Sequence, residues 1–134
     1  MAMVDRSGLP LAIDLESASP HESKLLEALL RKSFLRRAVD RPRFLIGDKA
    51  YDSDPLDERL ARKGITLIAP HRANRRVLTQ DRRHLRRYKR RWKVERFFSW
   101  LFNFRKLVTR YEVHAVNFFG FLHLACAMVL LRRL

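Results

Sequence analysis

Two acidic residues, Asp48 and Glu95, lie where carboxylates can take part in metal chemistry. Asp48 follows residues 43–47, a short apolar run bounded by breakers that predicts a buried strand. Glu95 lies in residues 88–106, which lack Gly and Pro and show no apolar alternation, so they predict a helix. Hard divalent cations bind carboxylate oxygens, and two such ions can activate an attacking hydroxyl and stabilise the oxygen that leaves a phosphodiester. Two acids from separate elements are therefore candidates for metal-dependent phosphoryl transfer, provided that they converge.

Both acids also have common structural interpretations. Glu95 can form an ion pair with Arg91, one helical turn earlier, and such pairs are frequent on helices. An Asp after a strand is more often a turn or cap residue than a metal ligand. Asp5 and Asp14 are further candidate acids, but we expect Asp5 to form a turn and Asp14 to be solvated at a strand end.

The chain of 134 residues carries a net charge of +15, which favours a polyanionic partner, with nucleic acid first and an anionic membrane surface second. Residues 71–96 hold 12 of the 29 Lys and Arg residues, with only Asp81 and Glu95 as acids. Such a density of like charge is costly without a counter-charge. We expect double-stranded DNA to contact this region and the cations after it, through Arg86, Arg87, Tyr88, Arg90, Arg91, Lys93, Arg105 and Lys106.

Breakers and hydrophobic spacing divide the chain into an α/β order of elements. The strand, helix and strand between residues 43 and 69 imply a parallel crossover. This crossover puts Asp48 at the carboxyl end of a strand, where α/β sheets bind ligands. The predicted elements are a hairpin at 1–16, a helix at 20–39, a strand at 43–47, a helix at 54–63, a strand at 65–69, a long basic helix at 80–107 and an apolar helix at 114–134.

The C-terminal helix contains the most apolar run of the chain, residues 115–131. That run is at the short edge of the roughly 17–25 residues that span a membrane, and it contains Asn117, Gly120 and His123, so we expect a buried core helix. The lone Cys126 excludes an intrachain disulfide and a cysteine-cluster zinc site. The N-terminus shows no signal-peptide pattern, so we expect a cytoplasmic protein without a membrane partner.

Several motifs resemble those of bacterial insertion-sequence transposases of the DDE type. Gly47-Asp48-Lys-Ala-Tyr51-Asp52 is similar to the segment around the second acid of that family. Tyr88-x-x-Arg91-x-x-x-Glu95 is similar to the signature of the third acid, and it continues as Arg96-x-Phe98-x-Trp100. Asp5-x-x-Gly8-x-Pro10 resembles the hairpin between the first two acids. The resemblance covers nearly the whole chain, in the right order.

The resemblance implies an incomplete ribonuclease H-like fold, Mg²⁺ or Mn²⁺ bound by Asp48 and Glu95, and cutting and joining of DNA at insertion-sequence ends. Phe102 stands where the family signature often has Lys, although Arg105 and Lys106 lie nearby. The first acid of the family lies on a strand before the hairpin, and we find no counterpart to it. We therefore expect the C-terminal part of such a catalytic domain, from a bacterial, nucleoid-associated protein, and no DNA cleavage by this chain alone.

Three interpretations remain open at this point. The chain can be part of a DDE transposase, either as a remnant or as the downstream product of two overlapping frames, with the upstream product or a second copy of itself as partner. It can also be a non-catalytic basic module that binds nucleic acid. The third interpretation is a basic protein attached to a membrane by its C-terminal helix. An upstream frame that encodes an Asp-bearing strand would favour the first interpretation.

Overall fold

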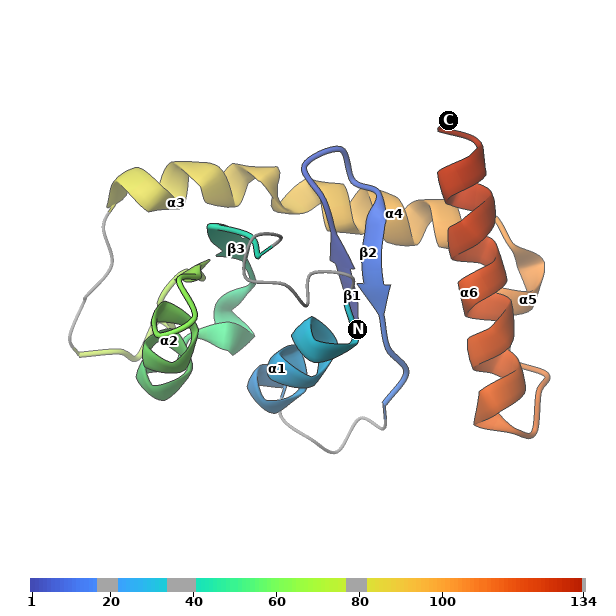
Figure 1. The fold of residues 1–134 in the computed structure, drawn as a ribbon, viewed down its shortest axis with the longest axis horizontal. Coiled ribbons are helices and arrows are strands. Elements are labelled where there is room, and N and C mark those ends of the chain that lie inside the picture. The colour runs from blue at the N-terminus through green and yellow to red at the C-terminus, as the bar shows by residue number, and fades with distance from the viewer. Residues whose placement is uncertain (17–21, 34–40, 77–81, 134) are drawn as a thin grey trace. The chain divides into compact units, whose positions relative to one another are not determined.

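The computed structural model describes residues 1–16, 22–33, 41–76 and 82–133 (Figure 1). The chain divides into two compact units. Met1–Ala18 and Trp92–Leu134 form one unit, here called the terminal unit, and Ser19–Arg91 form the other, here called the central unit. The architecture is mixed α/β, with helices and two small two-stranded sheets. Parts of three predicted helices, at 20–21, 34–39, 80–81 and 134, lie outside the described residues.

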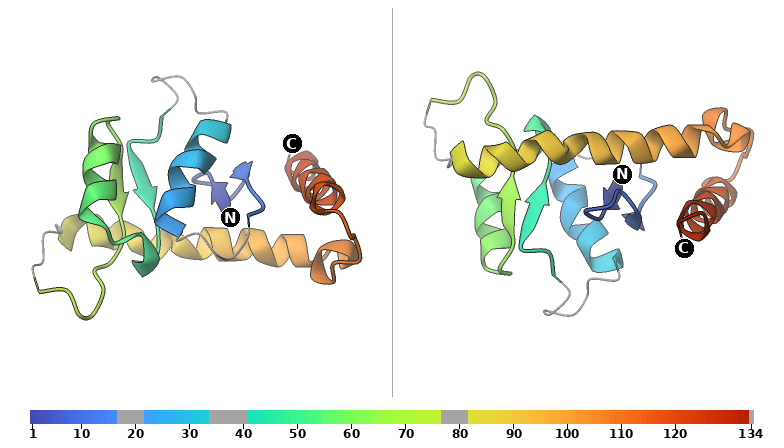
Figure 2. Two further views of the ribbon diagram at one scale, coloured as in Figure 1. Left: turned by 90° about the horizontal axis from the view of Figure 1, so that it is seen from below. Right: turned by 90° about the horizontal axis from the view of Figure 1, so that it is seen from above.

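The central unit is built around a pair of parallel strands. Its elements are α1 (Glu22–Lys32), β3 (Phe44–Ile46), η2 (Lys49–Tyr51), α2 (Asp54–Ala61), β4 (Thr66–Ile68), α3 (Arg82–Tyr88) and η3 (Lys89–Arg91), where η2 and η3 are 3-10 turns. β3 pairs with β4 along its length, and both α2 and α3 lie against β4 (Figure 2). The sequence pattern located both strands to within one residue at each end. The core of the unit consists of buried Leu26, Leu56, Leu60 and Ile65.

The terminal unit combines an antiparallel hairpin with three helices. Its elements are β1 (Ala2–Val4), β2 (Pro10–Ile13), α4 (Trp92–Phe102), α5 (Arg105–Val108) and α6 (Ala115–Leu131). Its core is formed by buried side chains from the hairpin and all three helices, namely Ile13, Phe97, Leu101, Leu107, Leu122, Ala125, Cys126 and Val129. Burial raises the pKa of the Cys126 thiol to about 11, so this side chain acts as a small core hydrophobe.

The hairpin turn is closed by Asp5. Its Oδ1 accepts hydrogen bonds from the backbone N–H groups of Ser7 (2.7 Å) and Leu9 (2.8 Å), and Gly8 supplies the left-handed conformation with φ +86°. Asp5 is thus a turn former, as expected. The expectation for Asp14 was wrong, because Asp14 is only 6% exposed and its Oδ1 accepts from the N–H of Leu15 at 3.1 Å.

The predicted basic helix at 80–107 is not continuous. α3 ends at Tyr88, η3 interrupts the α-helical hydrogen bonding, α4 ends at Phe102 and α5 is a separate helix. Cations four residues apart, at 86 and 90 and at 87 and 91, repel each other on a helix, which disfavours regular α-helix at the first interruption. At the second interruption Phe104 adopts an extended conformation (φ −89°, ψ 106°) and packs against the core of the terminal unit.

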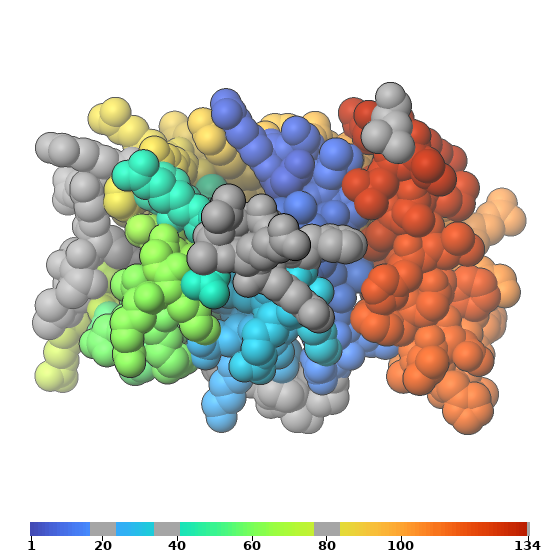
Figure 3. All heavy atoms as spheres, in the orientation of Figure 1, coloured from blue at the N-terminus to red at the C-terminus, as the bar shows by residue number. Residues whose placement is uncertain are grey.

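α6 buries one face only, so the prediction of a buried core helix was half right. Leu122, Cys126 and Val129 face the core, whereas Val116 and Leu131 are 79% and 69% exposed. Figure 3 shows the outer side of α6, in red and orange, uncovered in that view. Among the described residues, we find no helix with the length and apolar content that crossing a membrane requires.

Candidate active site and nucleic-acid interface

Asp48 is the first candidate ligand, and it caps a turn at the carboxyl end of β3. Its Oδ1 accepts a hydrogen bond from the N–H of Ala50 at 2.8 Å, which opens the 3-10 turn η2. The preceding residue, Gly47, donates its N–H to the carbonyl of Ile68 at 3.0 Å, which extends the pairing of the two strands. Asp48 is half-buried, and a carboxylate has a second oxygen with which it can bind a cation. The side chain is therefore oriented by its own backbone at the edge of the parallel strand pair.

Gly47 leaves room for the ring of Tyr51. A Cβ at position 47 would lie 2.7 Å from Tyr51 Cδ2, which is closer than real Cβ contacts allow, and 3.1 Å from its Cγ, which is tighter than most. Tyr51 in turn packs against the core of the central unit, which contains Leu26. The turn that follows Asp48 is thus anchored to the core by Tyr51, and this contact requires glycine at position 47.

Asp52 joins this turn to the loop after β4. Its side chain is only 3% exposed, and its Oδ1 lies 2.9 Å from His71 Nδ1 and 2.5 Å from Arg75 Nη1. Its Oδ2 accepts from the backbone N–H of Arg72 at 2.8 Å. Burial alone would raise the pKa of Asp52, but hydrogen bonds from Arg72 and His71 and the charge of Arg75 outweigh it, so that the pKa lies below the ordinary value.

Sequence reasoning assigned no role to Asp52, although it lies in the quoted motif. The signal available in the sequence was an acid after one parallel strand and a basic loop after the next. Residues at the carboxyl ends of neighbouring parallel strands meet at one edge of a sheet, so charge complementarity between them could have been predicted.

Two more acids lie beside this cluster, in the first turn of α2. Asp54 accepts from Arg75 Nη2. The pKa of Asp57 is raised to about 6, first by burial and then by the negative charges of Asp54 and Asp52, against the opposing charges of Arg75 and His71. Asp57 therefore has an unusually high proton affinity for an aspartate near the turn that carries Asp48.

Glu95, the second candidate ligand, is exposed on α4 in the terminal unit. Asp48 belongs to the central unit, so the two candidate ligands come from different units. Their carboxylate oxygens are the donor type that Mg²⁺ and Mn²⁺ prefer, but two carboxylates do not complete a two-metal site. Within the ranges that the structure describes, no group of three or more His, Cys, Asp and Glu side chains could hold a metal ion.

The motif around Glu95 fastens α4 to the hairpin. Lys93 Nζ donates to the carbonyl of Arg6, and Arg96 Nη2 donates to the carbonyl of Ser7 at 3.0 Å. The Arg96 guanidinium also lies over the rings of Trp92 and Trp100, at 4.5 and 4.9 Å from their centroids. These contacts give a structural reason for the spacing of the aromatic and basic residues beside Glu95.

The eight predicted DNA-contacting residues are not equally available. Arg87 is half-buried with its guanidinium 3.8 Å from the centre of the Phe44 ring, and Lys93 is engaged by the hairpin. Tyr88 is also half-buried, and the guanidinium of Arg91 lies 5.6 Å from its ring centre. The exposed members of the set are Arg86 and Arg90 in the central unit and Arg105 and Lys106 in the terminal unit.

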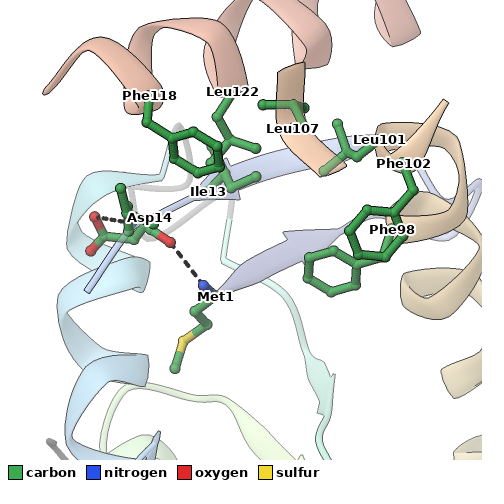
Figure 4. A pocket seen from close by; sticks show the side chains of 10 residues that line it. Met1, Ile13, Asp14, Phe98, Leu101, Phe102, Leu107, Phe118 and Leu122 are labelled. Atoms are coloured by element: carbon green, nitrogen blue, oxygen red, sulfur yellow. Dashed lines mark hydrogen bonds between the residues drawn. The ribbon is translucent and has the colours of Figure 1, made fainter. Parts of the chain in front are cut away.

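An apolar cavity of about 180 Å³ lies in the terminal unit, between the hairpin and the helices (Figure 4). Phe98, Phe118 and Leu122 contribute to its wall, and the N-terminal ammonium group of Met1 donates to the carbonyl of Asp14 at its edge, at 2.8 Å. Neither Asp48 nor Glu95 lines this cavity. Its apolar wall offers few ligands for a metal ion, so we do not assign the candidate active site to it.

The chain belongs to the Transposase DDE domain family, whose model matches residues 1–130. It is 36% identical over 137 residues to "Putative transposase for insertion sequence element IS6501" of Brucella ovis, and the alignment covers 98% of this chain and 95% of the relative. It is 34% identical over 132 residues to "Putative transposase for insertion sequence element IS402" of Burkholderia cepacia, and the alignment covers 95% of this chain and 59% of the relative. These findings confirm the family resemblance seen in the motifs and support a role in transposition.

No solved structure matches the chain at a significant level. The family generally uses divalent metal ions, which fits the carboxylate donors of Asp48 and Glu95 by type. The chain spans most of the first relative but only about three fifths of the second.

Proposed function

We propose that this chain supplies the second and third carboxylates of a DDE transposase, Asp48 and Glu95, for metal-dependent cutting and joining of DNA at insertion-sequence ends. In this proposal the two units are parts of an incomplete ribonuclease H-like domain. Mg²⁺ or Mn²⁺ bound by the two acids would supply the Lewis acid for phosphoryl transfer, and the chain's own residues would orient it. The observation that carries the proposal is the position of Asp48, the second residue after β3, at the carboxyl end of a parallel strand pair.

DNA binding is the second part of the proposal. Arg86 and Arg90 are exposed and four residues apart, and Arg105 and Lys106 are exposed in α5. Cations of this kind neutralise phosphates without reading sequence, which favours backbone contacts with duplex DNA. We assign Arg87 and Lys93 mainly to packing, because both are engaged within their own unit.

Turnover would require a further carboxylate that Asp5 and Asp14 do not offer. Asp5 is committed to the hairpin turn, and Asp14 is buried. The upstream product of an overlapping frame would be one source of that acid. The second candidate function, a non-catalytic module that binds DNA, is favoured by the exposed cations Arg86 and Arg90, which can contact phosphates without a metal ion.

The test is a cleavage reaction on insertion-sequence end DNA with Mg²⁺ or Mn²⁺. We compare the 134-residue chain with the same chain extended upstream by a strand that carries an Asp. We expect no cleavage by the chain alone, cleavage by the extended protein, and its loss with Asp48→Ala or Glu95→Ala. DNA binding without cleavage by either protein would favour the non-catalytic module. Cleavage by the chain alone that Asp48→Ala leaves intact would contradict the assignment of Asp48.

A further inference from the structure

The loops after β3 and β4 begin side by side. Ile46 is opposite Ile68 at the ends of the parallel strands, and the Gly47 N–H continues the pairing by one bond to the Ile68 carbonyl. Residues 48–53 and 70–76 therefore leave the same edge of the strand pair. Asp48 is the first residue of one loop, and His71 is the second residue of the other.

Arg72 crosses from the second loop to the first. Its Nε donates to the carbonyl of Lys49 at 3.3 Å, and its Nη2 donates to the carbonyl of Ala50 at 3.2 Å. These carbonyls belong to the two residues that follow Asp48. The N–H of Ala50 donates to Asp48 Oδ1, so Arg72 holds the same turn that orients the Asp48 carboxylate.

Asp52 in turn fixes Arg72. The Asp52 carboxylate accepts hydrogen bonds from the backbone N–H of Arg72, from His71 Nδ1 and from Arg75 Nη1. The Asp52 side chain is almost fully buried. Loss of these donors would leave a buried carboxylate without hydrogen bonds, which costs free energy, so the folded state favours the contact with Arg72. A continuous set of bonds thus leads from Asp52 through Arg72 and the η2 turn to Asp48.

We propose that Asp52 and Arg72 are positioning residues for Asp48, and that the basic loop after β4 orients a metal-binding carboxylate instead of binding DNA phosphates. The part that concerns metal rests on the proposed function. The physical reason is that groups behind a metal ligand fix its direction, and their removal typically costs about 10–100-fold in metal affinity or activity. The set is also local, because every member belongs to the central unit.

The experiment uses Arg72→Ala and Asp52→Asn in the full chain, with Arg76→Ala as a control. Arg76 is exposed in the same loop, so its substitution removes the same charge as Arg72→Ala. Arg72→Ala keeps the backbone hydrogen bond to Asp52. Asp52→Asn replaces one carboxylate oxygen by an NH2 group, which opposes either the backbone N–H of Arg72 or the donors of His71 and Arg75. Urea unfolding of each variant shows whether it remains folded.

Two readouts decide the proposal. The first is hydrogen exchange of the Ala50 amide by NMR without metal, which we expect to become about 10-fold faster or more in Arg72→Ala and unchanged in Arg76→Ala. The second is Mn²⁺ broadening of amide signals beside Asp48 in the presence of duplex DNA. We expect Arg72→Ala and Asp52→Asn to need about 10-fold more Mn²⁺ for the same broadening.

Unchanged Ala50 exchange in folded Arg72→Ala would overturn the inference, whatever the metal result. Faster Ala50 exchange with unchanged Mn²⁺ broadening would show that Arg72 has a structural role only, and this result would also overturn the inference. If the wild-type chain shows no Mn²⁺ broadening beside Asp48, the metal assignment in the proposed function fails. In that case, Ala50 exchange alone decides whether Arg72 holds the turn.

Discussion

Gly47→Ala tests the contact that anchors the turn after Asp48. The new methyl group would lie 2.7, 3.1 and 3.3 Å from Cδ2, Cγ and Cβ of Tyr51. Cβ and Cγ lie on the axis of ring rotation, so turning the ring moves Cδ2 but leaves the tight contacts at 3.1 and 3.3 Å. Overpacking of this kind costs about 1–3 kcal/mol. The lower entropy of the unfolded chain offsets about 0.4–1 kcal/mol of this cost. The midpoints of the two ranges give a net loss of about 1.3 kcal/mol in the free energy of unfolding.

Gly120→Ala is the matched control, because a Cβ there meets no atom within 4 Å. Gly120 lies inside α6, where Ala is favoured over Gly by about 1 kcal/mol, so the same substitution should stabilise the protein. Both are measured by urea unfolding. The cost of Gly47→Ala should also shrink in a Tyr51→Ala background, since the clashing ring is absent. A neutral Gly47→Ala, or a cost that persists without Tyr51, would refute the reasoning.

Two further predictions concern charge. Each phosphate contact contributes about 0.9 to the salt slope of duplex binding, so Arg86→Ala with Arg90→Ala should lower the slope by about 2. Lys24→Ala with Arg62→Ala removes the same charge from exposed positions and should leave the slope nearly unchanged; equal effects would contradict the placement of the interface. The pKa of Asp57 is about 6 in the folded state and 3.8 in the unfolded state, so the folded state binds more protons between these pH values. This group therefore makes the free energy of unfolding fall as pH rises from about 4 to 6. Asp57→Asn should therefore gain stability relative to wild type from about pH 4 to pH 6, measured by urea unfolding at each pH; a constant difference would show that the Asp57 pKa is not raised.

The hairpin and the parallel strands could be predicted because their signals are local. Asp5 and Gly8 specify a turn by side-chain hydrogen bonding and by a positive φ, and both properties belong to the residues themselves. The strands β3 and β4 are short apolar runs between breakers, which the pattern locates without knowledge of their partners. The position of Asp48 at the end of β3 follows from the same pattern.

The break in the basic helix and the role of Asp52 depend on contacts distant in sequence. Helix propensity favours residues 80–107 throughout, but packing of Phe104 into the core ends the helix earlier. Asp52 looks like an ordinary loop acid until the strand pairing brings His71 and Arg72 to it from about 20 positions later. Side-chain clusters of this kind are visible only once the register of the strands is known.

The cations near the two candidate acids explain why metal and DNA would act together in the proposed function. Arg72 holds the turn after Asp48, while Lys93 and Arg96 hold α4, which carries Glu95. These contacts place cations on the loop that packs against the Asp48 turn and on the helix that carries Glu95, and like charge repels a divalent cation. A DNA phosphate supplies the missing negative charge and further oxygen ligands, so it lowers the electrostatic cost of metal binding. An ion would then be held where a phosphodiester is present, which confines the chemistry to bound DNA.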